Sequence, residues 1–228
     1  MSKEASRLAL AAGALLVVFG IGAFLYNQSQ SDAQSSLLAA ADDTVFERPH
    51  SVTKGSADAQ VTIVEFLDPE CGSCKLMHPY VKRVMNQYGS RVRLVIRYLP
   101  LHKNSIQAIA ALEAAREQDR FWDMLEILFR EQHIWGSHKL PRPELIPGYA
   151  EQIGLDMEAY DRVVSRGEYK KLADIDRADA ATLGVRGTPT FFVNGRPLEK
   201  LGYDGLRQLV ADALAQSSRT DSESGTES

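Results

Sequence analysis

Cysteine is nearly absent from this chain of 228 residues, which contains only Cys71 and Cys74. A disulfide framework that stabilises a fold joins distant cysteines, whereas a bridge across two intervening residues removes little conformational entropy from the unfolded chain. A zinc site usually takes four ligands, and the sequence offers no second cysteine pair and one closely spaced histidine pair, His133 and His138. A structural bridge and a zinc site are therefore weaker alternatives than reversible redox chemistry at this pair.

An excess of positive charge is also missing. The chain has 26 Lys and Arg residues against 30 Asp and Glu residues, a net charge of −4. It shows no basic stripe of the kind that binds nucleic acid, no glycine-rich phosphate loop and no Ser-His-Asp arrangement. We therefore expect no nucleic-acid partner, no cofactor and no metal.

The sequence has one long apolar run, at its N-terminus. Lys3 and Arg7 precede it, and residues 8–26 contain no charged side chain. As a helix this segment would span about 28 Å, close to the thickness of a bilayer's hydrocarbon core. The positive-inside rule then places residues 1–7 in the cytoplasm. We expect a single-pass anchor in the cytoplasmic (inner) membrane with the catalytic domain on the extracytoplasmic, periplasmic side; a cleaved signal peptide is the alternative.

The rest of the chain divides by composition. Residues 27–45 are polar and small, which predicts a flexible linker, although the apolar residues 37–41 could form a short helix. Residues 46–216 are long enough for one domain with a sizeable core. Residues 217–228 are rich in Ser, Thr, Glu and Asp and predict a disordered tail.

Hydrophobic periodicity gives a coarse fold for this domain. The run Val61–Leu67 is β-branched and apolar on both faces except at Glu65, which predicts a strand covered on both sides. Cys71 then lies near the start of a helix, and residues 91–99 alternate as a second strand. This succession predicts a βαβ unit.

The sheet pattern resumes only near the C-terminus. Residues of about 102–184 show helical spacing, and the next strand pattern is Thr190–Val193, closed by the turn signal Asn194-Gly195. A last amphipathic helix begins at Tyr203. The sequence therefore predicts an α/β domain interrupted by a helical insertion.

Two motifs carry a resemblance to a known family. The motif Cys71-Gly-Ser-Cys74 follows a strand and opens a helix, and Thr188-Pro189 precedes the last strand pattern. Together with the insertion and its entry Leu99-Pro-Leu-His102, they resemble the DsbA-like branch of the thioredoxin-fold thiol–disulfide oxidoreductases. The resemblance implies a thioredoxin fold with the helical insertion between its βαβ half and its cis-Pro ββα half.

The resemblance also implies roles for particular residues. Thr188-Pro189 would have a cis peptide bond beside the disulfide and expose a backbone edge that binds an extended substrate segment. Glu65 matches the position of a buried acid that relays a proton to or from Cys74; a solvated carboxylate at the strand end is the alternative. The implied partners are exported proteins with cysteine thiols and a membrane redox protein that resets the active site.

The position of the cysteines assigns their chemistry. Cys71, at the helix start, faces unpaired backbone N–H groups that stabilise a thiolate, so we expect it to be the nucleophile. Cys74, one turn further, would be the resolving thiol. Asp68 and Glu70 would oppose the thiolate as exposed, screened charges. His78 and His102 could modulate the thiolate, but nothing in their spacing supports this, and we expect surface or packing roles.

We therefore predict an extracytoplasmic dithiol–disulfide oxidoreductase that introduces disulfide bonds into exported proteins through the redox-active pair Cys71 and Cys74. One alternative uses the same site in the opposite direction, as a reductase or isomerase. Another is a non-catalytic binding module that holds peptides at the sheet edge beside Pro189. The residues between the two cysteines do not decide among these functions.

Overall fold

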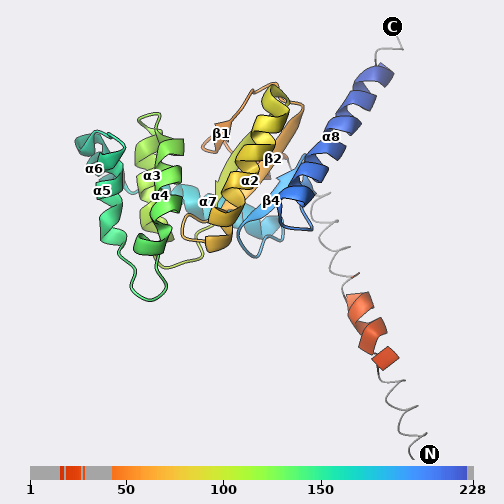
Figure 1. Cartoon of the computed structure of the whole chain (residues 1–228), viewed down its shortest axis with the longest axis horizontal. Coiled ribbons are helices and arrows are strands. Elements are labelled where there is room, and N and C mark those ends of the chain that lie inside the picture. The colour runs from red at the N-terminus through yellow and green to blue at the C-terminus, as the bar shows by residue number, and fades with distance from the viewer. Residues whose placement is uncertain (1–15, 18, 27, 29–42, 225–228) are drawn as a thin grey trace, which may run out of the picture. The chain divides into compact units, whose positions relative to one another are not determined.

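The computed structural model describes residues 16, 17, 19–26, 28 and 43–224 (Figure 1). The chain divides into two compact units, residues 1–42 and residues 43–228. The predicted N-terminal segment 1–7 and most of the predicted linker 27–45 lie outside the described residues.

The structure contradicts the predicted membrane localisation. Within the described residues, no helix has the length and apolar character needed to cross a bilayer. The predicted anchor covers residues 8–26, and the structure describes residues 16, 17 and 19–26 of it. Residues 8–15 and 18 of that segment lie outside the described residues. The prediction of a single-pass membrane anchor is therefore wrong, because no described helix could form such an anchor.

The second unit combines a five-stranded sheet with helices. In chain order its elements are η1 (Asp43–Val45), β1 (Val52–Lys54), β2 (Val61–Leu67), α2 (Gly72–Tyr88), η2 (Gly89–Arg91), β3 (Val92–Tyr98), α3 (Ser105–Arg116), α4 (Phe121–Trp135), η3 (Pro143–Leu145), α5 (Ile146–Gln152), α6 (Met157–Arg166), α7 (Tyr169–Thr182), β4 (Thr190–Val193), β5 (Arg196–Pro197) and α8 (Tyr203–Ser224).

The strand order is β1-β3-β2-β4-β5. Strands β2 and β3 are parallel, in register from Val61 opposite Val92 to Leu67 opposite Tyr98, and the other neighbouring strands pair antiparallel. The predicted βαβ unit is therefore β2-α2-β3, and β4, β5 and α8 form the second half of the sheet. Helices α3 to α7 lie between these halves, which confirms the α/β thioredoxin fold with a helical insertion.

The two faces of the sheet pack against different helices. Ile63 and Leu67 of β2 belong to one hydrophobic core with residues of α2 and α8, and these two helices lie in front of the strands in Figure 1. Phe66 points to the other face, where its ring lies 6.2 Å from that of Phe192 and where α7 contacts β3. Alternation along a strand explains this division, and both faces are covered as the apolar β2 sequence predicts.

Helix α8 continues to Ser224, so it extends past residue 216 into the segment for which a disordered tail was predicted. The first part of that segment contains no glycine or proline to end the helix, whereas Gly225 follows its last helical residue. Residues 225–228 lie outside the described residues.

A buried ion cluster joins α7 to the second face of the sheet. Arg97 of β3 is fully buried, and its guanidinium donates to Asp176 at 2.8 Å and to Asp179 at 2.5 Å. Arg97 also donates to the Val45 carbonyl, and Arg48 donates to Asp179. Burial opposes the charge of Asp179, but its hydrogen bonds to Arg48 and Arg97 outweigh burial and lower the pKa of its carboxyl group. The cluster thus neutralises charges that would otherwise be costly to bury.

We expect Arg97→Met to reduce the free energy of unfolding by about 3 kcal/mol, because it leaves two buried carboxylates without their shared partner. Urea unfolding followed by circular dichroism measures this loss. Arg177→Met is the matched control, since Arg177 forms an exposed pair with Asp174 on the same helix, and its removal should cost less than about 0.5 kcal/mol. Equal losses in both variants would contradict the stabilising role of the buried cluster.

Candidate active site

The two cysteines lie at the start of α2. Cys71 is the N-cap residue, with extended backbone angles (φ −73°, ψ 122°), and α2 begins at Gly72. Cys71 is 7% exposed and Cys74, one turn further along, is fully buried. Both thiols are free in this structure, so it represents the reduced form. Of the pair, only Cys71 retains some exposure to solvent.

The loop before β4 lies against Cys71. The Thr188-Pro189 peptide bond is cis, as the resemblance implied. The Cys71 thiol donates to the Thr188 carbonyl oxygen, with 3.2 Å between the sulfur and the oxygen. Residues 117 positions apart in the chain therefore meet at the reactive sulfur.

The surroundings of Cys71 favour its thiolate. The side chain of Cys74 donates a hydrogen bond to the Cys71 sulfur, and this is the largest contribution to its pKa. Burial opposes the charge, but the Thr188 side chain and the backbone N–H groups of Cys74 and Ser73 add further donors, and together they lower the pKa of Cys71 from 9.0 to about 5. Donors at the N-terminus of α2 thus hold the sulfur in the form that attacks disulfides.

Glu65 and Cys74 are both buried beside the Cys71 thiol, since each of them interacts electrostatically with it. Burial raises the pKa of the Cys74 thiol, and its hydrogen bond to Cys71 and the charge of Glu65 raise it further. Burial, followed by the charge of Cys71, raises the pKa of Glu65 to about 8. Glu65 Oε1 has no hydrogen-bond partner among the described residues. The alternative of a solvated carboxylate at this position is therefore wrong.

Asp68 and Glu70 are placed differently from the prediction, because both are buried and hydrogen-bonded. The Asp68 carboxylate accepts from the backbone N–H of Leu101 at 2.8 Å and from His102 Nδ1 at 2.7 Å. The Glu70 carboxylate accepts from the backbone and side chain of Asn104, at 2.6 and 2.7 Å. These carboxylates join the loop before Cys71 to the loop after β3, and they are not exposed charges.

Two further residues contact this loop and were not predicted as part of the site. Gln132 of α4 donates to the carbonyl oxygens of Pro69 and Cys71, at 2.9 and 3.1 Å. Burial lowers the pKa of His102, but the hydrogen bond and charge of Asp68 outweigh it and raise that pKa overall. The entry motif Leu99-Pro-Leu-His102 drew attention to His102 in the sequence. Nothing in the sequence around Gln132 indicates its contacts with Pro69 and Cys71, which lie 63 and 61 positions away.

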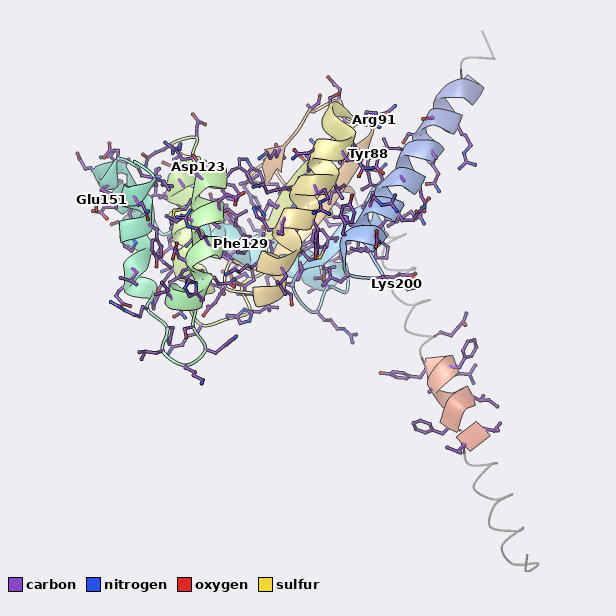
Figure 2. The ribbon with its side chains drawn as sticks, viewed as in Figure 1. Tyr88, Arg91, Asp123, Phe129, Glu151 and Lys200 are labelled. Carbon is purple, nitrogen blue, oxygen red and sulfur yellow. The ribbon has the colours of Figure 1, made fainter. Side chains whose placement is uncertain are left out.

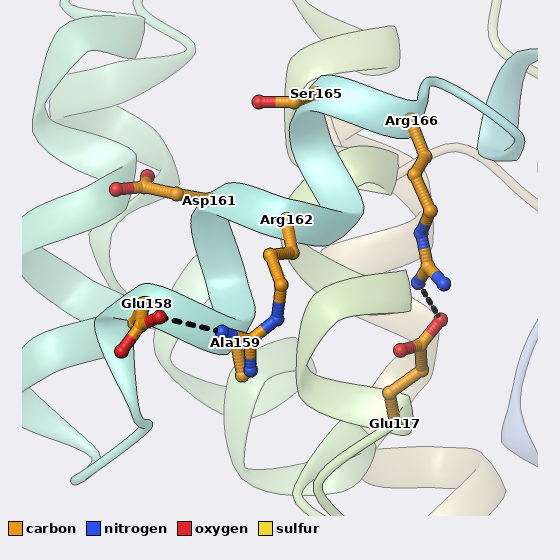
Figure 3. A pocket seen from close by; sticks show the side chains of 7 residues that line it. All are labelled: Glu117, Glu158, Ala159, Asp161, Arg162, Ser165 and Arg166. Atoms are coloured by element: carbon orange, nitrogen blue, oxygen red, sulfur yellow. Dashed lines mark hydrogen bonds and ion pairs between the residues drawn. The ribbon is translucent and has the colours of Figure 1, made fainter.

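The remaining candidates are His78, a hollow on the helical insertion and a metal site. His78 packs its ring 5.1 Å from that of Phe129 and contacts Glu126, in accord with a packing role. A hollow on the insertion is lined by α6 residues and Glu117, and its ion pairs join Arg162 to Glu158 and Arg166 to Glu117 (Figure 3). No group of three or more His, Cys, Asp or Glu side chains is placed to hold a metal in the part of the chain that the structure describes.

A thioredoxin fold with a buried dithiol at a helix N-terminus, beside a cis-proline loop, defines the class of thiol–disulfide oxidoreductases. A family model described as thioredoxin matches residues 47–212, which is more than half of the chain, and the protein therefore belongs to this thioredoxin family. Its structural neighbours are DsbA-like members of the class.

Three solved structures illustrate the similarity. A thioredoxin-like oxidoreductase from Silicibacter pomeroyi is 26% identical, with a TM-score of 0.65 over 79% of this chain and 99% of that one. The thiol–disulfide exchange protein α-DsbA2 from Wolbachia pipientis is 21% identical, with a TM-score of 0.66 over 81% and 97%. Oxidised BdbD from Bacillus subtilis is 23% identical, with a TM-score of 0.61 over 72% and 93%. The last two likenesses show the fold alone.

Sequence relatives include much longer proteins. A Na⁺/H⁺ antiporter NhaA from Herminiimonas arsenicoxydans is 36% identical over 168 residues, which cover 73% of this chain and 26% of the antiporter. NhaA 3 from Salinispora tropica is 37% identical over 187 residues, covering 79% and 27%. The chain thus spans about a quarter of the length of these relatives.

We expect the Cys71 thiolate to titrate near pH 5 in the reduced protein, and Cys74→Ala to raise this midpoint by one pH unit or more, because the variant removes its largest stabilising hydrogen bond. Thiolate absorbance at 240 nm against pH measures the midpoint. Ser73→Ala is the matched control, since Ser73 contributes its backbone N–H, which the variant keeps. The prediction fails if Cys74→Ala and Ser73→Ala titrate alike.

We expect Glu65→Gln to stabilise the reduced protein increasingly as the pH rises. A pKa raised to about 8 in the folded protein from an ordinary 4.5 means that this carboxyl group favours folding below pH 4.5 and loses that contribution as the pH rises through 8. The difference in unfolding free energy between variant and native protein should grow by about 2–4 kcal/mol from pH 4.5 to pH 9. Urea unfolding across this range tests it, and a difference that does not change with pH would contradict the burial of an ionisable Glu65.

Proposed function

We propose that this protein oxidises thiol pairs of exported proteins by transferring to them the disulfide between Cys71 and Cys74. The observation that carries the proposal is the set of hydrogen-bond donors around the Cys71 sulfur, which lowers its pKa to about 5. A disulfide whose reduced form is stabilised as a thiolate is a stronger oxidant. This favours the oxidase over the reductase that uses the same residues.

The exchange has two steps. A substrate thiolate attacks Cys71 Sγ, the bond to Cys74 Sγ breaks, and Cys74 leaves with the electron pair of that bond. The second substrate thiolate then attacks the substrate sulfur of the mixed disulfide, which releases the Cys71 thiolate and completes the substrate disulfide. Cys71 is the better leaving group because its pKa is the lower of the two. The substrate is thereby oxidised by two electrons and the protein is reduced.

The raised pKa of Glu65 suits this carboxyl group to exchange a proton with the buried Cys74 thiol. Cys74 leaves in an environment that disfavours its thiolate, so it needs a proton at that moment. Glu65, with a pKa of about 8 and an oxygen without a partner among the described residues, holds a proton at neutral pH. We assign to it the delivery of this proton and its removal when the disulfide is restored.

The backbone of Thr188 and Pro189 is our proposed substrate contact. Thr188 O lies 3.2 Å from Cys71 Sγ, so an extended segment bound along this loop would bring its own cysteine to the reactive sulfur. A separate membrane redox protein would then accept the two electrons and restore the disulfide. Exported proteins with cysteine thiols are the proposed substrates.

The reduction potential of the cysteine pair tests the direction of the reaction. We expect a value near about −120 mV, characteristic of strong oxidants, after equilibration of the purified protein with glutathione mixtures and quantification of free thiols. A value near about −270 mV would instead assign the protein as a reductase. Cys71→Ser distinguishes both from a binding module, because retention of function by this variant would show that the chemistry of the pair is incidental.

A further inference from the structure

A groove runs along the outer side of α2, where it faces α4. His78 of α2 packs on Phe129 of α4 at its centre, and Figure 2 shows Phe129 at the junction of these helices. The groove is lined by Lys75, His78, Pro79, Lys82, Arg83, Asn86, Glu126, Phe129 and Arg130. We call this set the α2–α4 groove.

The charge of the α2–α4 groove is opposite to that of the whole chain. Four cationic side chains and one carboxylate line it, whereas the chain carries a net charge of −4. The carboxylate, Glu126, is shared by Lys82 and His78. Lys82 is 50% exposed and Arg130 is 60% exposed. The groove therefore presents positive charge to solvent on a protein that is otherwise acidic, which favours an anionic ligand.

The direction of the groove links it to the reactive pair. Lys75, Pro79, Lys82 and Asn86 recur at helical spacing on one side of α2, and the first of them directly follows Cys74. From Lys75 to Asn86 the helix rises about 16 Å, a length that about five residues of an extended peptide cover. Two of these four residues, Lys75 and Lys82, are cations, and the line begins one residue after Cys74.

The groove also offers apolar contact. It adjoins a small hollow lined by Val81, Met85, Leu94 and Trp122, which shares His78, Lys82, Asn86 and Glu126 with it. Lys54 lies 4.8 Å from the centre of the Trp122 ring and adds a cation at this end. An elongated site with spaced cations and an apolar hollow matches a peptide better than a single small anion.

We propose that the α2–α4 groove binds an acidic segment, about five residues long, of the proteins that exchange disulfides at Cys71. This inference rests on the proposed function and adds substrate recognition to it. Acidic side chains would lie near Lys82, Arg83 and Arg130, and an apolar side chain would enter the hollow beside Trp122. The groove thereby selects thiol proteins by the charge that flanks their cysteines.

Two model peptides with the same cysteine pair test the proposal. In one, the five flanking residues contain three Asp or Glu, and in the other they are neutral. At low ionic strength we expect the oxidised native protein to react with the acidic peptide about tenfold faster, and 0.5 M NaCl should bring the ratio of the two rates close to one, since exposed charges are then screened. A ratio near one at low ionic strength overturns the proposal.

Charge-reversal variants test whether the α2–α4 groove causes the difference in rate between the two peptides. Lys82→Glu with Arg130→Glu should lower the rate ratio at least fivefold. The matched control is Arg177→Glu with Arg162→Glu, because these arginines are 50% and 60% exposed and ion-paired, as Lys82 and Arg130 are, but lie on α7 and α6. An equal fall of the ratio in both double variants overturns the proposal, since it would reflect net charge alone.

A binding measurement separates docking from chemistry. The acidic peptide with serine in place of cysteine, labelled with fluorescein, should bind the native protein at least fivefold more tightly than the Lys82→Glu, Arg130→Glu variant by fluorescence anisotropy. This result supports docking even if neither peptide is oxidised. Failure to oxidise either peptide would contradict the proposed oxidase function and leave the docking proposal standing. Equal binding to both proteins, or binding only to anionic lipid vesicles, overturns the proposed docking.

Discussion

Two buried carboxylates fix the loop that carries Cys71. Asp68 and Glu70 precede the cysteine, and their oxygens accept hydrogen bonds from the loop that follows β3, at Leu101, His102 and Asn104. The Leu99 N–H also donates to the Leu67 carbonyl at 2.9 Å. Because β2 and β3 are adjacent and parallel, their ends meet at one edge of the sheet, and the buried carboxylates satisfy the polar groups where the chain leaves it. The hydrogen bonds at this edge of the sheet therefore fix the position of the start of α2 and of the Cys71 sulfur.

The helical insertion contributes to the active site from both of its ends. Its first loop supplies the donors to Asp68 and Glu70, and Gln132 of α4 donates to the Cys71 carbonyl. Its last helix, α7, is bound behind the sheet by the buried pairs of Arg97 with Asp176 and Asp179, and it leads directly into the loop of Thr188. The insertion is thus fixed to both faces of the sheet while it positions the two loops that flank the sulfur.

The fold could be predicted from local patterns, and the site from two motifs. The β-branched run of β2, the helical spacing of α2 and the turn at Asn194 follow from neighbouring residues, and the pairing of the cysteine motif with Thr188-Pro189 came from the family resemblance. The buried polar contacts could not be predicted, because Arg97, Asp68 and Gln132 find their partners across the sheet or the insertion. Because Asp68 and Glu70 are charged, they were predicted to be exposed. They are buried instead, and hydrogen bonds compensate the cost of burying their carboxylates. The predicted membrane anchor was wrong, since no helix among the described residues is long and apolar enough to cross a bilayer.

The order of strands also has a consequence for how the chain folds. Strand β2 pairs with β4 across more than a hundred residues, as Ile63 lies opposite Val193, whereas the β2-α2-β3 unit and the helices of the insertion form from segments close in sequence. Contacts between distant segments carry the greater loop-closure cost, because more chain must be ordered before they form. The Thr188 loop leads into β4, so its place beside Cys71 depends on this costly pairing. A chain in which β2 and β4 had not paired would hold both thiols on α2 without the carbonyl oxygen that contacts Cys71.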